Sequence, residues 1–162
     1  MQGQGEADLA AMRQGLAAEL ATGATLWQPY FLGLLAEAYG VGRHPDEGLA
    51  ALAAALAVLD PTEARYYDAE IYRLKGALLL QQAVPDAAQA EACFHQALDI
   101  ARRQEAKSLE LRAAMSLSRL WQQQGKRAEA HALLAPVYGW FTEGFDTADL
   151  QDAKALLEEL GG

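Results

Sequence analysis

The sequence predicts an all-α protein of about eight helices that pack in successive pairs. Three observations lead to this fold class. Ala, Leu, Glu and Gln, which favour helices, dominate the 162 residues, whereas the β-branched residues that favour strands are scarce. Turn-forming residues recur at intervals that suit short helices. A pattern of small and large apolar residues also repeats along the chain.

Seven turn signals divide the chain into eight segments with helical spacing of apolar residues. They contain glycine, proline or short polar runs and lie at Gly23 and at residues 40–45, 60–61, 84–86, 104–107, 125–126 and 139–146. Asp60, Asp86 and Asp46 each stand where an N-cap is expected. Glu63, three residues after Asp60, completes a capping box. These caps mark the starts of three of the predicted helices.

The second helix of each predicted pair carries a small residue, a large apolar residue four positions later and a small or β-branched residue three positions after that. The triplets are Gly48, Leu52 and Ala55; Ala90, Phe94 and Ala97; and Ala130, Leu134 and Val137. Matching small residues in the preceding helices are Gly33, Gly76 and Ser118. Small residues let two helix backbones approach closely, and the large residue fills the remaining space. This is a tetratricopeptide-like signature, which predicts antiparallel helix pairs stacked in a right-handed superhelix.

The pattern departs from the usual tetratricopeptide repeat in several respects. The triplets are 42 and 40 residues apart, longer than the usual period of about 34 residues. Lys75 replaces a usual leucine, and Ala114 replaces a common aromatic residue. A generic helical solenoid is therefore an alternative. The chain is expected to be a single repeat domain over residues 1–162, with units at 24–60, 61–105 and 106–142, a partial unit at 1–22 and a terminal helix at 146–160.

Bulk properties exclude several classes of protein. The longest apolar run, residues 49–59, is too short to cross a bilayer. Charged residues within 1–22 interrupt any secretory leader, and the single Cys93 excludes an intramolecular disulfide. We therefore expect a cytoplasmic protein without a membrane partner.

The net charge of −9 argues against nucleic acid as a partner, because such binding depends on neutralising phosphates. One segment is basic: residues 102–127 hold seven Lys or Arg residues against two Glu. These basic groups either decorate solvated helix faces or serve one acidic partner.

No motif for catalysis or cofactor binding is recognisable. Residues 40–48 are rich in glycine but lack the lysine and the preceding strand of a phosphate-binding loop. Glu91 and His95 have the spacing of two metal ligands on one helix, but no second pair lies nearby in sequence. Cys93 is expected to pack as a small apolar residue, and His131 to be solvated. We expect no enzyme activity, no cofactor and no metal.

Several phrases resemble the C-terminal repeat region of large predicted regulatory ATPases of bacteria, which are often fused to a class III adenylate or guanylate cyclase-like domain. They are Tyr-Arg-Leu-Lys-Gly at 72–76, Ala-Glu-Ala-Cys-Phe at 90–94, Gln-Ala-Leu-Asp-Ile-Ala-Arg at 96–102, Lys-Ser-Leu-Glu-Leu-Arg-Ala-Ala at 107–114, Leu-Trp-Gln-Gln-Gln-Gly at 120–125 and Tyr-Gly-Trp-Phe-Thr-Glu-Gly-Phe-Asp at 138–146. The resemblance covers about residues 10–160. It implies a sensing or scaffolding role and transfers no catalytic residue.

Candidate binding residues follow from the expected stacking, in which the first helix of each pair lines a concave face. They are Trp27, Tyr30, Leu34, Glu70, Arg73, Arg112, Met115 and Arg119. Aromatic residues and methionine with three arginines suit an acidic, partly apolar peptide or helix. Two alternatives apply. Trp27 and Tyr30 cover the end of the stack, or Glu70, Glu110 and neighbouring carboxylates already pair with the arginines.

The predicted function is a non-catalytic protein–protein interaction or scaffolding module of a larger bacterial signalling protein. One alternative is an allosteric sensor that holds a small molecule within the superhelix. Another is self-association through an exposed end of the stack. The apolar residues expected at that end are Leu9, Met12, Leu16 and Leu20.

Overall fold

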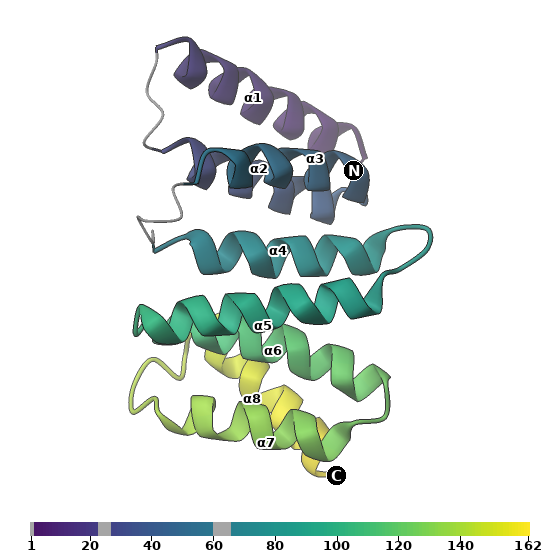
Figure 1. Ribbon diagram of the computed structural model, residues 1–162, viewed down its shortest axis with the longest axis vertical. Helices are drawn as coiled ribbons and strands as arrows, with labels where there is room; N and C mark the ends of the chain where they lie inside the picture. The colour runs from purple at the N-terminus through teal and green to yellow at the C-terminus, as the bar shows by residue number, and fades with distance from the viewer. Residues whose placement is uncertain (1, 23–26, 60–65) are drawn as a thin grey trace.

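The computed structural model describes residues 2–22, 27–59 and 66–162, and within these ranges it contains eight α-helices and no strand (Figure 1). The helices are α1 (Gln2–Ala21), α2 (Gln28–Val41), α3 (Pro45–Ala57), α4 (Asp68–Gln81), α5 (Ala87–Arg103), α6 (Lys107–Gln123), α7 (Arg127–Gly139) and α8 (Ala148–Gly161). The all-α prediction with about eight helices is confirmed. The predicted cap at Asp60 and its partner Glu63 lie outside the described residues.

Neighbouring helices pack in pairs that are stacked along the long axis of the molecule (Figure 1). Helix α2 packs on α3, α4 on α5, and α6 on α7. Each second helix also contacts the next first helix, and the first helices α2, α4, α6 and α8 contact one another in turn. Helix α1 contacts α2 as α3 contacts α4, so it occupies the place of a second helix. This packing fits a helical repeat.

The repeated small residues are the points where paired helices meet most closely. A Cβ atom added to Gly76 would lie 2.5 Å from a ring carbon of Phe94 and 3.0 Å from the carbonyl oxygen of Ala90. Both Phe94 and Ala90 are buried. In the third pair, the Ser118 hydroxyl donates a hydrogen bond to the Ala130 carbonyl oxygen across 3.2 Å. The predicted pattern therefore marks real helix contacts in these two pairs.

The first pair meets at a different residue from the one expected. A Cβ atom added to Gly48 would lie 3.3 Å from the carbonyl oxygen of Ala36, so Ala36 is the small residue opposite Gly48. Gly33 instead faces the Tyr67 ring, which would lie 2.6 Å from an added Cβ atom. The reason is register: Ala36 and Gly48 are as far apart in sequence as Ser118 and Ala130.

Three turns between helices share one geometry. Arg43, Glu105 and Gly125 have φ angles of 63°, 54° and 79°, in the left-handed region. In each turn the next residue donates its backbone N–H to a carbonyl oxygen five residues earlier, over 2.8–2.9 Å. This is the Schellman arrangement, which satisfies the last carbonyl groups of a helix.

The predicted caps have different outcomes. The Asp86 carboxylate accepts a hydrogen bond from the Gln89 backbone N–H at 2.9 Å, as a cap should. Asp46 does not cap α3, because His44 occupies the N-cap and Pro45 begins the helix. Asp46 lies in the first turn instead, where its charge favours the positive end of the helix dipole.

Part of the α1 face that was expected to be exposed at the end of the stack packs against the first pair instead. Leu9 and Leu16 are half-buried against the core of the first pair, whereas Met12 is exposed. The side chain of Leu20 lies outside the described part of the chain. No helix in the described ranges is both long enough and apolar enough to cross a membrane.

Candidate functional site

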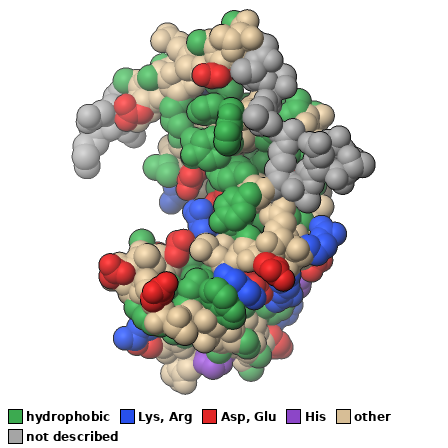
Figure 2. All heavy atoms as spheres, turned by 90° about the vertical axis from the view of Figure 1, so that its left-hand side faces the viewer, with side chains coloured by type: hydrophobic (Ala, Val, Ile, Leu, Met, Phe, Trp, Pro, Cys, Tyr) green, Lys and Arg blue, Asp and Glu red, His purple; other side chains and the backbone are tan. Residues whose placement is uncertain are grey.

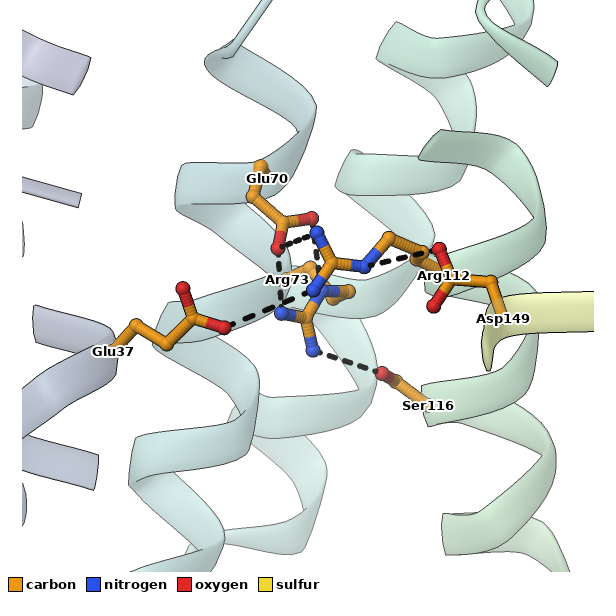
Figure 3. Close-up of polar contacts among 6 residues, drawn as sticks. All are labelled: Glu37, Glu70, Arg73, Arg112, Ser116 and Asp149. Carbon is orange, nitrogen blue, oxygen red and sulfur yellow. Dashed lines mark hydrogen bonds and ion pairs between the residues drawn. The ribbon is translucent and has the colours of Figure 1, made fainter. Parts of the chain in front are cut away.

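The first helices face a hollow on the left of the space-filling view (Figure 2). Lys and Arg side chains lie at the back of this hollow, with Asp and Glu side chains above and below them. Hydrogen bonds and ion pairs connect six polar residues of this face, one or two from each first helix. We call them the concave charge network: Glu37, Glu70, Arg73, Arg112, Ser116 and Asp149 (Figure 3).

Glu70 of α4 is the centre of the network and is only 1% exposed. Arg73, one turn later on the same helix, donates from Nε to Oε2 at 2.9 Å and from Nη2 to Oε1 at 2.6 Å. Arg112 of α6 brings Nη1 to 2.7 Å from Glu70 Oε1. One buried carboxylate therefore neutralises part of the charge of two arginines on neighbouring helices (Figure 3).

Arg112 extends the network to the helices on either side. Its Nη2 lies 3.8 Å from Glu37 on α2, and its Nε lies 3.8 Å from Asp149 on α8. Both distances exceed that of a hydrogen bond. Arg73 also donates from Nη1 to the Ser116 hydroxyl on α6 at 3.5 Å. The network thus reaches all four first helices.

The surroundings of Glu70 shift two pKa values. Burial works against the charge of Arg73, but the hydrogen bonds to Glu70 and the negative charges of Glu70 and Glu37 raise the pKa of Arg73 above its ordinary value. Burial, followed by the charges of Glu70 and Glu37, raises the pKa of Tyr67 to about 12. Arg73 stays charged and Tyr67 stays neutral at physiological pH.

The charges of the network are unequally accessible to solvent. The side chains of Glu37 and Asp149 are 44% and 46% exposed. Those of Arg73 and Arg112 are 14% and 31% exposed. Three carboxylates face two guanidinium groups, so the network carries one net negative charge.

Of the candidate binding residues on α4 and α6, some join the network and others do not. Glu70, Arg73 and Arg112 come together in the network. Met115, in contrast, lies in the hydrophobic core with neighbouring residues of α6, so it is not part of the concave surface. Arg119 is exposed, and no hydrogen bond or ion pair joins it to another residue in the described ranges.

The aromatic candidates lie at the beginning of α2. Trp27 precedes the helix and is exposed. Tyr30 contacts the rings of Phe31 and Tyr67, with centroids 5.6 and 5.0 Å apart. Leu34, one turn later, is half-buried. A partner of these aromatic residues would therefore meet an edge of the concave face.

Three residues of the network were not predicted from the sequence. Glu37 follows Tyr30 and Leu34 at helical spacing, so the same face of α2 carries it. Ser116 stands between Arg112 and Arg119 on one face of α6. These helical spacings could have placed Glu37 and Ser116 on the concave face from the sequence alone. The position of Asp149, in contrast, depends on how α8 packs on α6.

A shallow pocket of about 240 Å³ lies between α2 and α4, beside the network. Glu37 and Arg73 line its charged end. The other lining residues are Ala36, Gly40, Val41, Leu74, Ala77, Leu78 and Gln81. Its size suits one aliphatic side chain, which the apolar residues of its wall would contact.

A second buried carboxylate lies outside the hollow. Glu110 of α6 accepts hydrogen bonds from Lys107 Nζ at 2.8 Å and Arg102 Nε at 3.0 Å. Burial would raise the pKa of Glu110, but these hydrogen bonds and the positive charges behind them lower it below its ordinary value. Lys107 also lies over the Trp140 ring, 5.6 Å from its centroid.

The candidate metal pair has other contacts. Glu91 accepts a hydrogen bond from Trp121 Nε1 at 2.9 Å, and His95 Nε2 lies 3.8 Å from the same carboxylate oxygen. In the part of the chain that is described, no group of three or more His, Cys, Asp or Glu residues is placed to hold a metal ion. Cys93 is buried, as expected.

Comparison of the chain with protein-family models, with curated proteins and with solved structures finds no match.

Proposed function

We propose that this chain is a non-catalytic repeat module whose concave face binds a segment of another protein. The observation that carries the proposal is the concave charge network, which gathers side chains from four consecutive first helices beside a shallow pocket with apolar and charged residues in its wall. Stacked helix pairs commonly present an extended concave surface for such binding. A combination of one pocket with several charged groups gives a peptide both an anchor and a register.

The resemblance of residues 10–160 to the repeat regions of bacterial regulatory ATPases supports a place for this module within a larger cytoplasmic signalling protein. In that setting the module would recruit a partner or hold two domains together. The chemistry of the parent protein would belong to its other domains.

A pair of matched substitutions tests the proposal. Ala77→Trp would fill the pocket between α2 and α4, whereas Ala92→Trp adds the same bulk at an exposed position of α5. Each immobilised variant, with its fold checked by circular dichroism, is incubated with extract of the source cell. We expect wild type and Ala92→Trp to retain the same proteins, and Ala77→Trp to lose them. Identical capture by all three would place the binding face elsewhere.

A second candidate function is an allosteric small-molecule sensor. The observation in its favour is a larger pocket, of about 830 Å³, between α1 and the end of α2. Leu9, Ala38 and Val41 give it apolar walls, and Glu6 and His44 give it polar groups. A metabolite at 100 times its dissociation constant would stabilise the protein by about 2.7 kcal/mol, visible as a thermal shift. A shift that is lost in Leu9→Trp and kept in Ala77→Trp would favour the sensor over the module.

A further inference from the structure

We infer that the concave face selects a basic segment, with a lysine or arginine side chain at the exposed carboxylate of Glu37 or Asp149, on either side of Arg112, and an apolar side chain in the pocket between α2 and α4. This inference rests on the proposed function and names the chemistry of its partner. It also reverses the sequence-based expectation of an acidic partner.

The expectation of an acidic partner counted three arginines as one positive site. In the structure Arg73 and Arg112 are already within 2.7 Å of the Glu70 carboxylate. Only Arg119 has no such partner among the described residues. A carboxylate from outside would have to compete with Glu70, which is buried and fixed in position.

The accessible charge of the network is negative. Glu37 and Asp149 are each more exposed than either arginine, and the network as a whole carries one net negative charge. An incoming ammonium or guanidinium group would neutralise that charge, whereas a second anion would double it. The net charge of −9 on the whole chain would add long-range attraction for a basic segment.

The geometry leaves acceptors available. The Glu37 and Asp149 carboxylates stand 3.8 Å from Arg112, close enough for attraction but too far for hydrogen bonds. Their oxygens therefore retain lone pairs for another donor. Glu37 also lines the pocket between α2 and α4. A segment that places an apolar side chain in this pocket brings its neighbouring residues to Glu37.

Three pools of short labelled peptides test the inference by fluorescence anisotropy. Every peptide has a glycine–serine background with one leucine and one variable residue. The variable residue is lysine in the first pool, glutamate in the second and glutamine in the third, and within a pool it is placed in turn at each remaining position. The test variant combines Glu37→Gln with Asp149→Asn. The control combines Asp99→Asn with Glu129→Gln, which removes two exposed carboxylates from α5 and α7 and so gives the same net charge.

We expect wild type and the control to bind the lysine pool about tenfold more tightly than the glutamate pool, since attraction of lysine and repulsion of glutamate at a half-exposed carboxylate together reach roughly that factor. The preference should disappear in the Glu37/Asp149 variant and should weaken as salt rises. A lysine preference that survives in that variant overturns the inference. Equal or tighter binding of the glutamate pool, lost in Ala77→Trp, overturns the inference and leaves the proposed function standing. If none of the three pools binds at millimolar concentration, both fall.

Discussion

Glu70 and Glu110 are both buried carboxylates held by two basic side chains, yet they hold together different parts of the molecule. The partners of Glu70 come from two first helices, α4 and α6, and the network continues to α2 and α8. Those of Glu110 lie at one turn, where α5 ends and α6 begins. The same chemistry therefore fixes the spacing of the array in one place and closes a local turn in the other.

Exposure separates the two sites further. Arg73 is largely buried, whereas Arg102 at the Glu110 site is 48% exposed. Water screens an exposed ion pair, and an exposed cation that loses its partner is readily solvated. A buried arginine without its carboxylate has no such compensation. The two sites should therefore respond very differently to the same substitution.

The largest expected effect is that of Glu70→Gln. This change leaves Arg73 and Arg112 near each other without the carboxylate between them, and it should lower the free energy of unfolding by about 3–5 kcal/mol. Urea denaturation measures the loss. Glu37→Gln, at the exposed edge of the same network, is the control and should cost less than about 0.5 kcal/mol.

Glu110→Gln should have a smaller effect, of about 1–2 kcal/mol, because Arg102 can turn toward solvent when its partner is lost. The same denaturation experiment gives the value. If Glu110→Gln costs as much as Glu70→Gln, the contrast between a site that spans the array and a local site is wrong.

The pH dependence of stability sharpens the comparison. The pKa of Glu110 is lower in the folded protein than its ordinary value of about 4.3. Its contribution to stability is therefore complete above that ordinary value and is lost as the pH falls through the lower, folded-state pKa. The difference in unfolding free energy between wild type and Glu110→Gln should shrink between about pH 5 and pH 3. A difference in unfolding free energy that stays constant to pH 3 would show that folding does not lower the pKa of Glu110.

The smallest expected effect concerns Lys107, which contacts both Glu110 and the Trp140 ring. Trp140→Leu should cost about 0.5–1 kcal/mol, because the cation loses an aromatic face at a partly exposed site. A double-mutant cycle with Lys107→Gln separates this coupling from the loss of apolar contact. A coupling energy of zero would show that Lys107 serves Glu110 alone.

Local signals in the sequence account for most of the fold. Turn residues and the triplet of Ala90, Phe94 and Ala97 depend on neighbours a few positions away, and the helices lie where these signals place them. The register of the first pair was missed, because Gly33 and Ala36 are both small and only tertiary packing decides which one faces Gly48.

The concave charge network was only partly predictable. Glu70 and Arg112 are 42 residues apart, the same separation as the small residues Gly76 and Ser118 of the same two helices, so they hold equivalent positions on neighbouring first helices. That relation pointed to their pairing. No repeat relation links Glu37 or Asp149 to Arg112, and their approach depends on how α2 packs on α4 and α8 packs on α6. The sequence therefore indicated Glu70 and the arginines but not Glu37 and Asp149, which complete the network.

Backbone amide NMR during titration with the leucine–lysine peptide pool tests the central claim most directly, because it reports where a partner binds. We predict that chemical-shift changes concentrate on the concave sides of α2, α4, α6 and α8, with Glu37, Ala77 and Ser116 among the strongest. Amides of Asp99 and Glu129, on exposed positions of α5 and α7, should stay unchanged. Changes centred on α5 and α7, or on the loop that begins at Trp140, would contradict the account.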